Sequence, residues 1–102
     1  YVGYGGNDNS TTRFRRYKGE YYGVADDKVK PLLKEYTDAS HLLVPNQWYE
    51  IRIRVEKGIT TYSVNDEELF RYTLAGSEGD GHFGLRLLQN HVLFTDFKAT
   101  IL

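Results

Sequence analysis

The sequence predicts an all-β domain built from antiparallel sheets, and three observations support this fold class. Apolar and charged side chains alternate over residues 49–56, which is the period of a strand with one buried face. Lys57-Gly58 follows as a tight turn, because glycine readily takes the positive φ that a two-residue hairpin needs. Short strand-like segments separated by turn residues continue along the chain, which is typical of an antiparallel β-sandwich or jelly roll.

The segment over residues 48–72 is predicted to be a β-meander. After the Lys57-Gly58 turn, a return strand leads to a second polar turn over residues 65–68 and then to a third strand over residues 69–72. Alternation predicts that Arg52 and Arg54 point away from the core. The side chains expected to be buried are those of Tyr49, Ile51, Ile53, Val55, Tyr62 and Val64.

Residues 11–17 predict a further strand, which follows a loop rich in Gly, Asn and Asp over residues 5–10. The remaining patterns are weaker. They favour a strand over residues 21–24, one helical turn over 31–36, a loop over 38–46, and strands over 83–88 and 92–102. In the last of these strands, Leu93, Phe97, Ala99 and Ile101 are expected to face the core.

Composition limits the classes of function. The 102 residues suit one small domain, and a net charge of −1 gives no general attraction to nucleic acid or to anionic lipid. No stretch approaches the ~18 apolar residues of a membrane span. The absence of cysteine excludes disulfides, thiolate metal sites and a cysteine nucleophile. Because the chain begins with strand-like residues and lacks an initiator methionine, we expect a mature or excised piece of a longer protein.

Several motifs carry a resemblance to known families. Residues 48–66, with Trp48, Ile51, Ile53, Gly58 and the run Tyr62-Ser63-Val64-Asn65-Asp66, resemble the meander of concanavalin A-like lectin/glucanase domains. Residues 1–17 read YVGYGGNDNSTTRFRRY, and are similar to the signature of an uncharacterised jelly-roll family from polysaccharide-degrading loci of gut bacteria. Residues 41–49 and 81–86 also fit that family.

The resemblance implies a concanavalin A-like jelly roll in which residues 1–102 are either a single β-sandwich domain or the C-terminal portion of a larger one. It implies a secreted, periplasmic or cell-surface carbohydrate-active module that binds or cleaves an acidic oligo- or polysaccharide. A glycoside hydrolase or polysaccharide lyase, a non-catalytic carbohydrate-binding module and a structural fragment all remain open. If strands are missing, a second polypeptide or another copy of the chain is expected to complete the sandwich.

The cluster of Arg13, Arg15 and Arg16 is the sharpest chemical feature of the sequence. A guanidinium group presents a planar fork that holds carboxylate or sulfate through two hydrogen bonds. With Tyr17 on the face of Arg13 and Arg15, this strand is predicted to hold an acidic sugar by charge and ring stacking. The alternative is a solvated strand face whose arginines pair with acidic residues on neighbouring strands.

Asn9 completes this predicted substrate site together with His41, which follows the pattern of the resembled family and is a candidate general acid or base. The run Asn7-Asp8-Asn9 suits a turn, and calcium, bound through oxygen ligands, is the only cofactor that it suggests. No two histidines have metal-ligand spacing, so no metal site is predicted. The available carboxylate groups for glycoside hydrolysis are Asp26/Asp27 and Asp66/Glu67/Glu68, and the glucanase motif E-x-D-x-x-E is absent.

Overall fold

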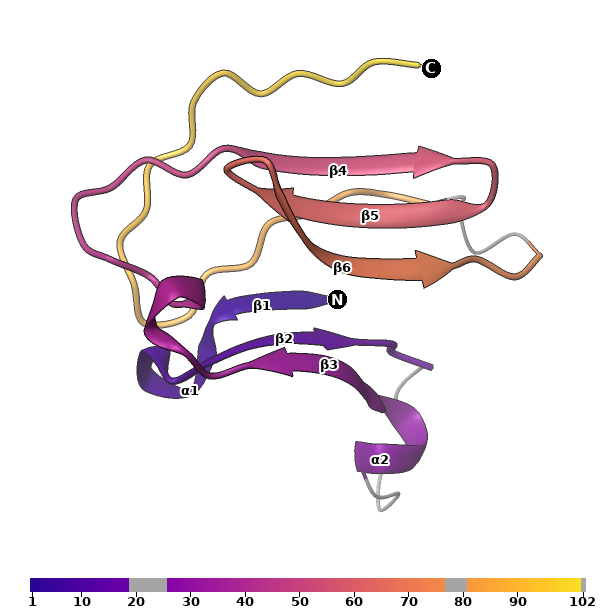
Figure 1. Ribbon diagram of the computed structural model, residues 1–102, viewed down its shortest axis with the longest axis horizontal. Helices are drawn as coiled ribbons and strands as arrows, with labels where there is room; N and C mark the ends of the chain where they lie inside the picture. The colour runs from indigo at the N-terminus through magenta and orange to yellow at the C-terminus, as the bar shows by residue number, and fades with distance from the viewer. Residues whose placement is uncertain (19–25, 77–80, 102) are drawn as a thin grey trace. The chain divides into compact units, whose positions relative to one another are not determined.

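The computed structural model describes residues 1–18, 26–76 and 81–101, and its strands form two three-stranded antiparallel sheets (Figure 1). The chain divides into two compact units, Tyr1–Glu50 and Ile51–Leu102, and each unit holds one sheet. The predicted all-β class of antiparallel sheets is therefore confirmed. No helix among the described residues is long and apolar enough to cross a membrane.

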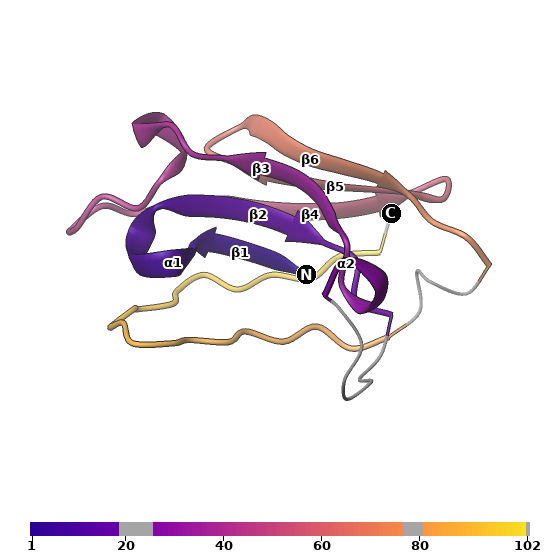
Figure 2. The ribbon, with the colours of Figure 1, turned by 90° about the horizontal axis from the view of Figure 1, so that it is seen from below.

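The first sheet consists of β1 (Val2–Gly5), β2 (Thr11–Arg15) and β3 (Leu32–Tyr36), with β2 in the centre. Figure 2 shows the three strands side by side. The strand predicted over residues 11–17 is confirmed over Thr11–Arg15. β2 is paired on both sides, so its backbone is hydrogen-bonded to both neighbouring strands.

The turn between β1 and β2 is left-handed. It contains α1 (Gly6–Asn9), in which Asn7, Asp8 and Asn9 have φ values of 51°, 57° and 59°. Asn and Asp tolerate this conformation better than other side chains do, since their short polar groups bond locally. The Gly, Asn and Asp residues that predicted a loop over residues 5–10 are therefore also the residues that suit a left-handed turn.

The prediction of a helical turn over residues 31–36 is wrong, because this segment forms β3. Thr12, Arg13 and Phe14 of β2 pair with β3, and a bulge shifts the register after Phe14. The sequence Leu-Leu-Lys-Glu favours a helix locally, and pairing with β2 overrides that preference. Two short helical segments flank β3: α2 (Asp26–Val29) and the 3-10 helix η1 (Ala39–His41). The strand predicted over residues 21–24 lies outside the described residues.

The second sheet confirms the predicted meander and consists of β4 (Ile51–Glu56), β5 (Ile59–Val64) and β6 (Glu67–Thr73). Its two turns have positive φ at both central residues, at Lys57 and Gly58 and again at Asn65 and Asp66. This geometry matches the right-handed twist of the paired strands.

Burial in this sheet follows only part of the prediction. Val64 is buried as predicted, and Tyr49 and Tyr62 are partly buried. The prediction is wrong for Ile51, Ile53 and Val55, whose exposed fractions are 46%, 47% and 46%. Alternation decides which side chains share a face, whereas burial requires another layer over that face, and β4 is an edge strand.

The buried residues of β6 are Leu69 and Phe70, at 1% exposure each. Tyr62 pairs with Phe70 and Ser63 pairs with Glu68, so Leu69 is the extra residue of a β-bulge. A bulge re-aims a side chain, which accounts for two consecutive buried residues in one strand. The rings of Tyr62 and Phe70 lie 5.9 Å apart across the pair.

The strands predicted over residues 83–88 and 92–102 are wrong, because residues 81–101 are irregular throughout. This segment is the orange-to-yellow trace in Figure 1. The rings of Phe83 and Phe97 lie 5.8 Å apart. The predicted core side chains Leu93, Phe97, Ala99 and Ile101 are exposed. A strand needs a ladder partner, and apolar alternation alone does not supply one.

Candidate functional site

Arg13 and Arg15 share one face of β2, as predicted. Side chains alternate along a strand, so Thr12 and Phe14 occupy the opposite face. On β1 the partner of Arg13 is Gly3, which has no side chain to cover the guanidinium group. The Arg13 side chain is partly exposed, with an exposed fraction of 35%.

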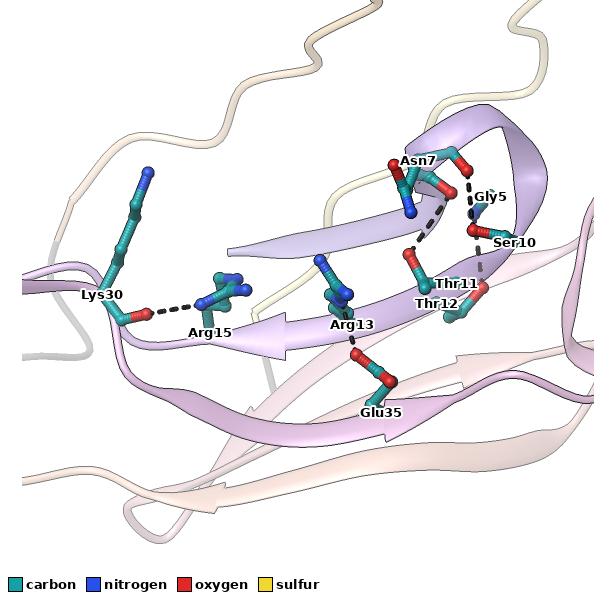
Figure 3. A network of polar contacts seen from close by, with 10 residues as sticks. Gly5, Asn7, Ser10, Thr11, Thr12, Arg13, Arg15, Lys30 and Glu35 are labelled. Carbon is teal, nitrogen blue, oxygen red and sulfur yellow. Dashed lines mark hydrogen bonds and ion pairs between the residues drawn. The ribbon is translucent and has the colours of Figure 1, made fainter. Parts of the chain in front are cut away.

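The Arg13 guanidinium forms an ion pair with the carboxylate of Glu35, its partner on β3. Arg13 Nε donates to Glu35 Oε2 over 2.5 Å, as Figure 3 shows. This contact agrees with the alternative interpretation of the cluster, an arginine paired across neighbouring strands. The contact engages one edge of the guanidinium group, and the terminal nitrogens have no protein partner within the described residues.

The Arg15 guanidinium lacks a carboxylate partner within the described part of the chain. Its Nη1 donates over 2.9 Å to the backbone carbonyl of Lys30 (Figure 3). That acceptor is neutral, so no acidic group among the described residues compensates the positive charge of Arg15. The contact holds the side chain in place and leaves other guanidinium donors for a ligand.

Tyr17 lies near this arginine in the chain and presents a half-exposed ring. The ammonium group of Lys30 lies 5.9 Å from the centroid of that ring, and the ring of Tyr1 lies 5.1 Å from it. We call Arg13, Arg15, Lys30 and Tyr17 the arginine face. It joins cationic donors to an aromatic surface, the chemistry that a carboxylated or sulfated sugar requires.

The structure gives the predicted residue Asn9 an internal role. Its side-chain Oδ1 accepts from the backbone N–H of Leu43, and its Nδ2 donates to the carbonyl of the same residue, both over 2.8 Å. The amide thus forms the two hydrogen bonds that a residue of a paired strand would form, and it links the left-handed turn to residues 42–44. Asn9 is engaged by protein atoms rather than placed beside the arginine face.

His41, the other predicted site residue, belongs to a separate cluster. Its Nδ1 lies 2.5 Å from Asp38 Oδ2, and its ring stacks on Tyr36 with centroids 4.1 Å apart. Tyr36 pairs with Thr12, which alternates with Arg13 along β2, so this cluster belongs to the opposite face of the sheet. Arg13 and Arg15 therefore share one face of β2, and His41 lies on the opposite face. Tyr17 follows the end of β2 and contacts Tyr1 and Lys30.

The Asp38 carboxylate orients the histidine ring. A hydrogen bond from the Ser40 hydroxyl, and then one from His41, hold the pKa of Asp38 below its usual value. Thr12, which is fully buried, donates its hydroxyl to the His41 carbonyl over 2.5 Å. An aspartate that fixes one ring nitrogen of a histidine is an arrangement suited to acid–base work at the other.

The site residues that sequence reasoning missed are Glu35, Tyr36 and Asp38. Each contacts its partner because of strand pairing or because of the 3-10 helix η1, and neither feature can be recognised from a local sequence pattern. Of the predicted carboxylates, Glu68 is held by Arg71 through two hydrogen bonds of 3.1 Å and 2.7 Å. The side chains of Asp26 and Asp27 lie outside the described part of the structure.

The described residues contain no group of three or more His, Cys, Asp or Glu side chains that could hold a metal ion. In the turn that suggested calcium, the Asn7 carbonyl accepts from the Ser10 hydroxyl over 2.7 Å. Calcium binding stays a prediction.

Comparison with known proteins identifies a family. The family model described as Domain of unknown function (DUF6250) matches residues 1–97. The chain belongs to this family. The DUF6250 match spans both sheets and all residues of the arginine face. Neither the curated proteins nor the solved structures contain a significant match.

Proposed function

We propose that this chain is a carbohydrate-active module that binds an acidic glycan on the arginine face. The observation that carries the proposal is the shared orientation of Arg13 and Arg15, each held by one contact with guanidinium donors to spare. Consecutive residues on one face of a strand lie about 6.6 Å apart, a spacing suited to two oxyanions or to one carboxylate and a neighbouring hydroxyl. Tyr17 supplies a ring against which the sugar stacks.

The charge balance of the arginine face favours an anionic ligand. Glu35 compensates Arg13, whereas Arg15 contacts a neutral carbonyl among the described residues, and the ammonium group of Lys30 lies beside the Tyr17 ring. A uronate or sulfate group that binds Arg15 would displace no ion pair formed among the described residues. Charge-assisted hydrogen bonds of this kind contribute about 1.5–3 kcal/mol each, and less where solvent screens them.

The setting of this function is proposed from the sequence resemblance. It comprises a concanavalin A-like jelly roll, a bacterial polysaccharide-degradation system and a secreted, periplasmic or cell-surface location. The presence of two antiparallel sheets and the motifs around residues 1–17 and 48–66 support it.

A matched panel of glycans tests the proposal. It consists of tetrasaccharides from polygalacturonate, alginate and glucuronoxylan, each beside its carboxyl-reduced form, at two salt concentrations. We expect the acidic form of at least one pair to bind more tightly at low salt, because exposed charges are screened within about 10 Å at 0.1 M salt. If no member binds, or if both forms bind equally at both salt concentrations, the proposed function is wrong.

Cleavage of the bound glycan is a second candidate function, and the Asp38–His41 contact favours it. Asp38 fixes Nδ1 of the ring, as in sites where histidine transfers protons. Incubating each acidic polymer with the wild-type protein and with His41→Gln tests this candidate through the release of new chain ends. Equal release by both proteins would exclude His41 from the reaction.

The third candidate is a structural module completed by a second polypeptide or another copy of this chain. Large exposed apolar side chains favour it, among them Ile51, Ile53, Val55, Leu93 and Phe97. Light scattering after size exclusion gives the mass directly. A stable, cooperatively melting monomer of 11.8 kDa would contradict this candidate.

A further inference from the structure

Trp48 is the only tryptophan of the chain, and 67% of it is exposed. It lies between η1 and β4, outside both sheets and outside the arginine face. Tryptophan is highly buried on average, since its ring has the largest apolar surface of any side chain. A lone indole presented to solvent therefore suggests a contact with something outside the chain.

The segment that carries Trp48 is fastened on both sides. Before it, the Asn9 amide bonds both backbone groups of Leu43. After it, the Tyr49 hydroxyl accepts from the backbone N–H of Val44 over 2.8 Å, and the Tyr49 ring lies 5.7 Å from that of Tyr4. A ring held on an anchored segment loses little freedom when it binds, which makes it a preorganised surface.

The surroundings of the ring indicate what it would bind. Asn46, Gln47 and Glu50 are exposed on the same segment, and residues 42–50 contain no Lys or Arg. Phosphate groups of lipid or nucleic acid attract basic residues, which are absent here. An isolated aromatic ring beside amide groups, which both donate and accept hydrogen bonds, suits the apolar face and the hydroxyl groups of a sugar ring.

We propose that Trp48 stacks on a sugar ring of the glycan while the amides of Asn46 and Gln47 bond its hydroxyl groups. This inference rests on the proposed function and deepens it, because it adds an uncharged contact to the ionic contact of the arginine face. Stacking depends on apolar area and hydroxyl geometry, so its contribution persists at high salt. The two contacts are separable by the carboxyl-reduced glycans.

Intrinsic fluorescence tests the inference directly, since the emission of the chain's single tryptophan reports Trp48 alone. The tetrasaccharides from polygalacturonate, alginate and glucuronoxylan, with their carboxyl-reduced forms, serve as probes. We expect a bound member to shift the emission to shorter wavelength and to protect the ring from acrylamide quenching. Trp48→Ala should weaken binding about fivefold to tenfold at both salt concentrations, whereas Trp48→Phe should retain most of the affinity.

Phe83→Ala is the matched control, because Phe83 is another exposed aromatic residue, at 57%, in the other unit. It should leave affinity unchanged. Glycan binding with unchanged emission and quenching would overturn the inference and leave the proposed function intact. If no glycan binds, both fail together. Protection of Trp48 that grows with protein concentration in the absence of glycan would overturn the inference in favour of a protein interface. If Trp48→Ala does not fold, the wild-type quenching experiment decides alone.

Discussion

The hydroxyl of Thr12 is expected to stabilise the segments that position the arginine face and the Asp38–His41 cluster. Thr12 is fully buried, donates to the His41 carbonyl over 2.5 Å and accepts from the Gly5 N–H over 3.3 Å. The change Thr12→Val keeps the shape of the side chain and removes both bonds. A partly buried carbonyl and a partly buried N–H then lose this partner. A fully buried group left without a partner costs about 1–3 kcal/mol, and because both groups here are only partly buried, we expect a total of about 2 kcal/mol.

Urea unfolding followed by far-UV circular dichroism measures this loss. With a slope near 1.5 kcal/mol per molar urea, the midpoint should fall by about 1.3 M. Thr12→Ser is the control, because it keeps the hydroxyl and should retain most of the stability. If Thr12→Val unfolds within 0.3 M of the wild type (about 0.5 kcal/mol, the scale of a neutral surface change), the assignment of this hydroxyl is wrong.

Three further predictions concern the turn and the two clusters. Gly5→Ala should destabilise the protein by about 2–4 kcal/mol and Gly58→Ala by about 1–2 kcal/mol. Both glycines have positive φ, but of the two only Gly5 would bring a Cβ against a neighbour, Leu43 at 2.6 Å. Equal unfolding midpoints for the two variants would contradict this. Asp38→Asn should lower the midpoint of urea unfolding near pH 7, because the Asp38 carboxylate stabilises the fold only when it is ionised. The difference in midpoint between this variant and the wild type should vanish as the pH falls through the lowered pKa of Asp38. A difference in midpoint that does not depend on pH would refute the stabilising contact of this carboxylate. Glu35→Gln should raise the affinity for the acidic tetrasaccharides, and calorimetry showing weaker binding would indicate that Glu35 orients Arg13 rather than competing for it.

The sequence was sufficient to predict elements whose signals are local. The meander over residues 51–73 combines strict alternation with turns that need positive φ, and neither feature depends on distant segments of the chain. The strand at Thr11–Arg15 and the shared face of Arg13 and Arg15 follow from the same period. The predictions that failed depended on distant segments: residues 31–36 became a strand through pairing with β2, and residues 83–101 lack the ladder partner that their alternation would need.

The candidate site shows the same division. The guanidinium groups and Tyr17 could be named from their order in the chain, but the carboxylate that pairs with Arg13 lies on another strand. His41 was singled out without its partners Tyr36 and Asp38, because a 3-10 turn leaves little trace in sequence. The apolar residues of β4 alternate as predicted and are nevertheless exposed, because the sequence of a strand does not show whether another layer covers its apolar face.

The central claim is that Arg15 binds the anionic group of a glycan. Isothermal titration calorimetry with the acidic tetrasaccharides, at low and at high salt, tests it on Arg15→Gln beside Arg54→Gln. Arg54 is a suitable control, because it is an exposed arginine on a strand of the other sheet, and it pairs with Glu56 over 2.9 Å. The account predicts that Arg15→Gln weakens binding at low salt about tenfold and flattens the salt dependence, whereas Arg54→Gln changes neither. Equal affinities and equal salt dependence in the two variants would contradict it.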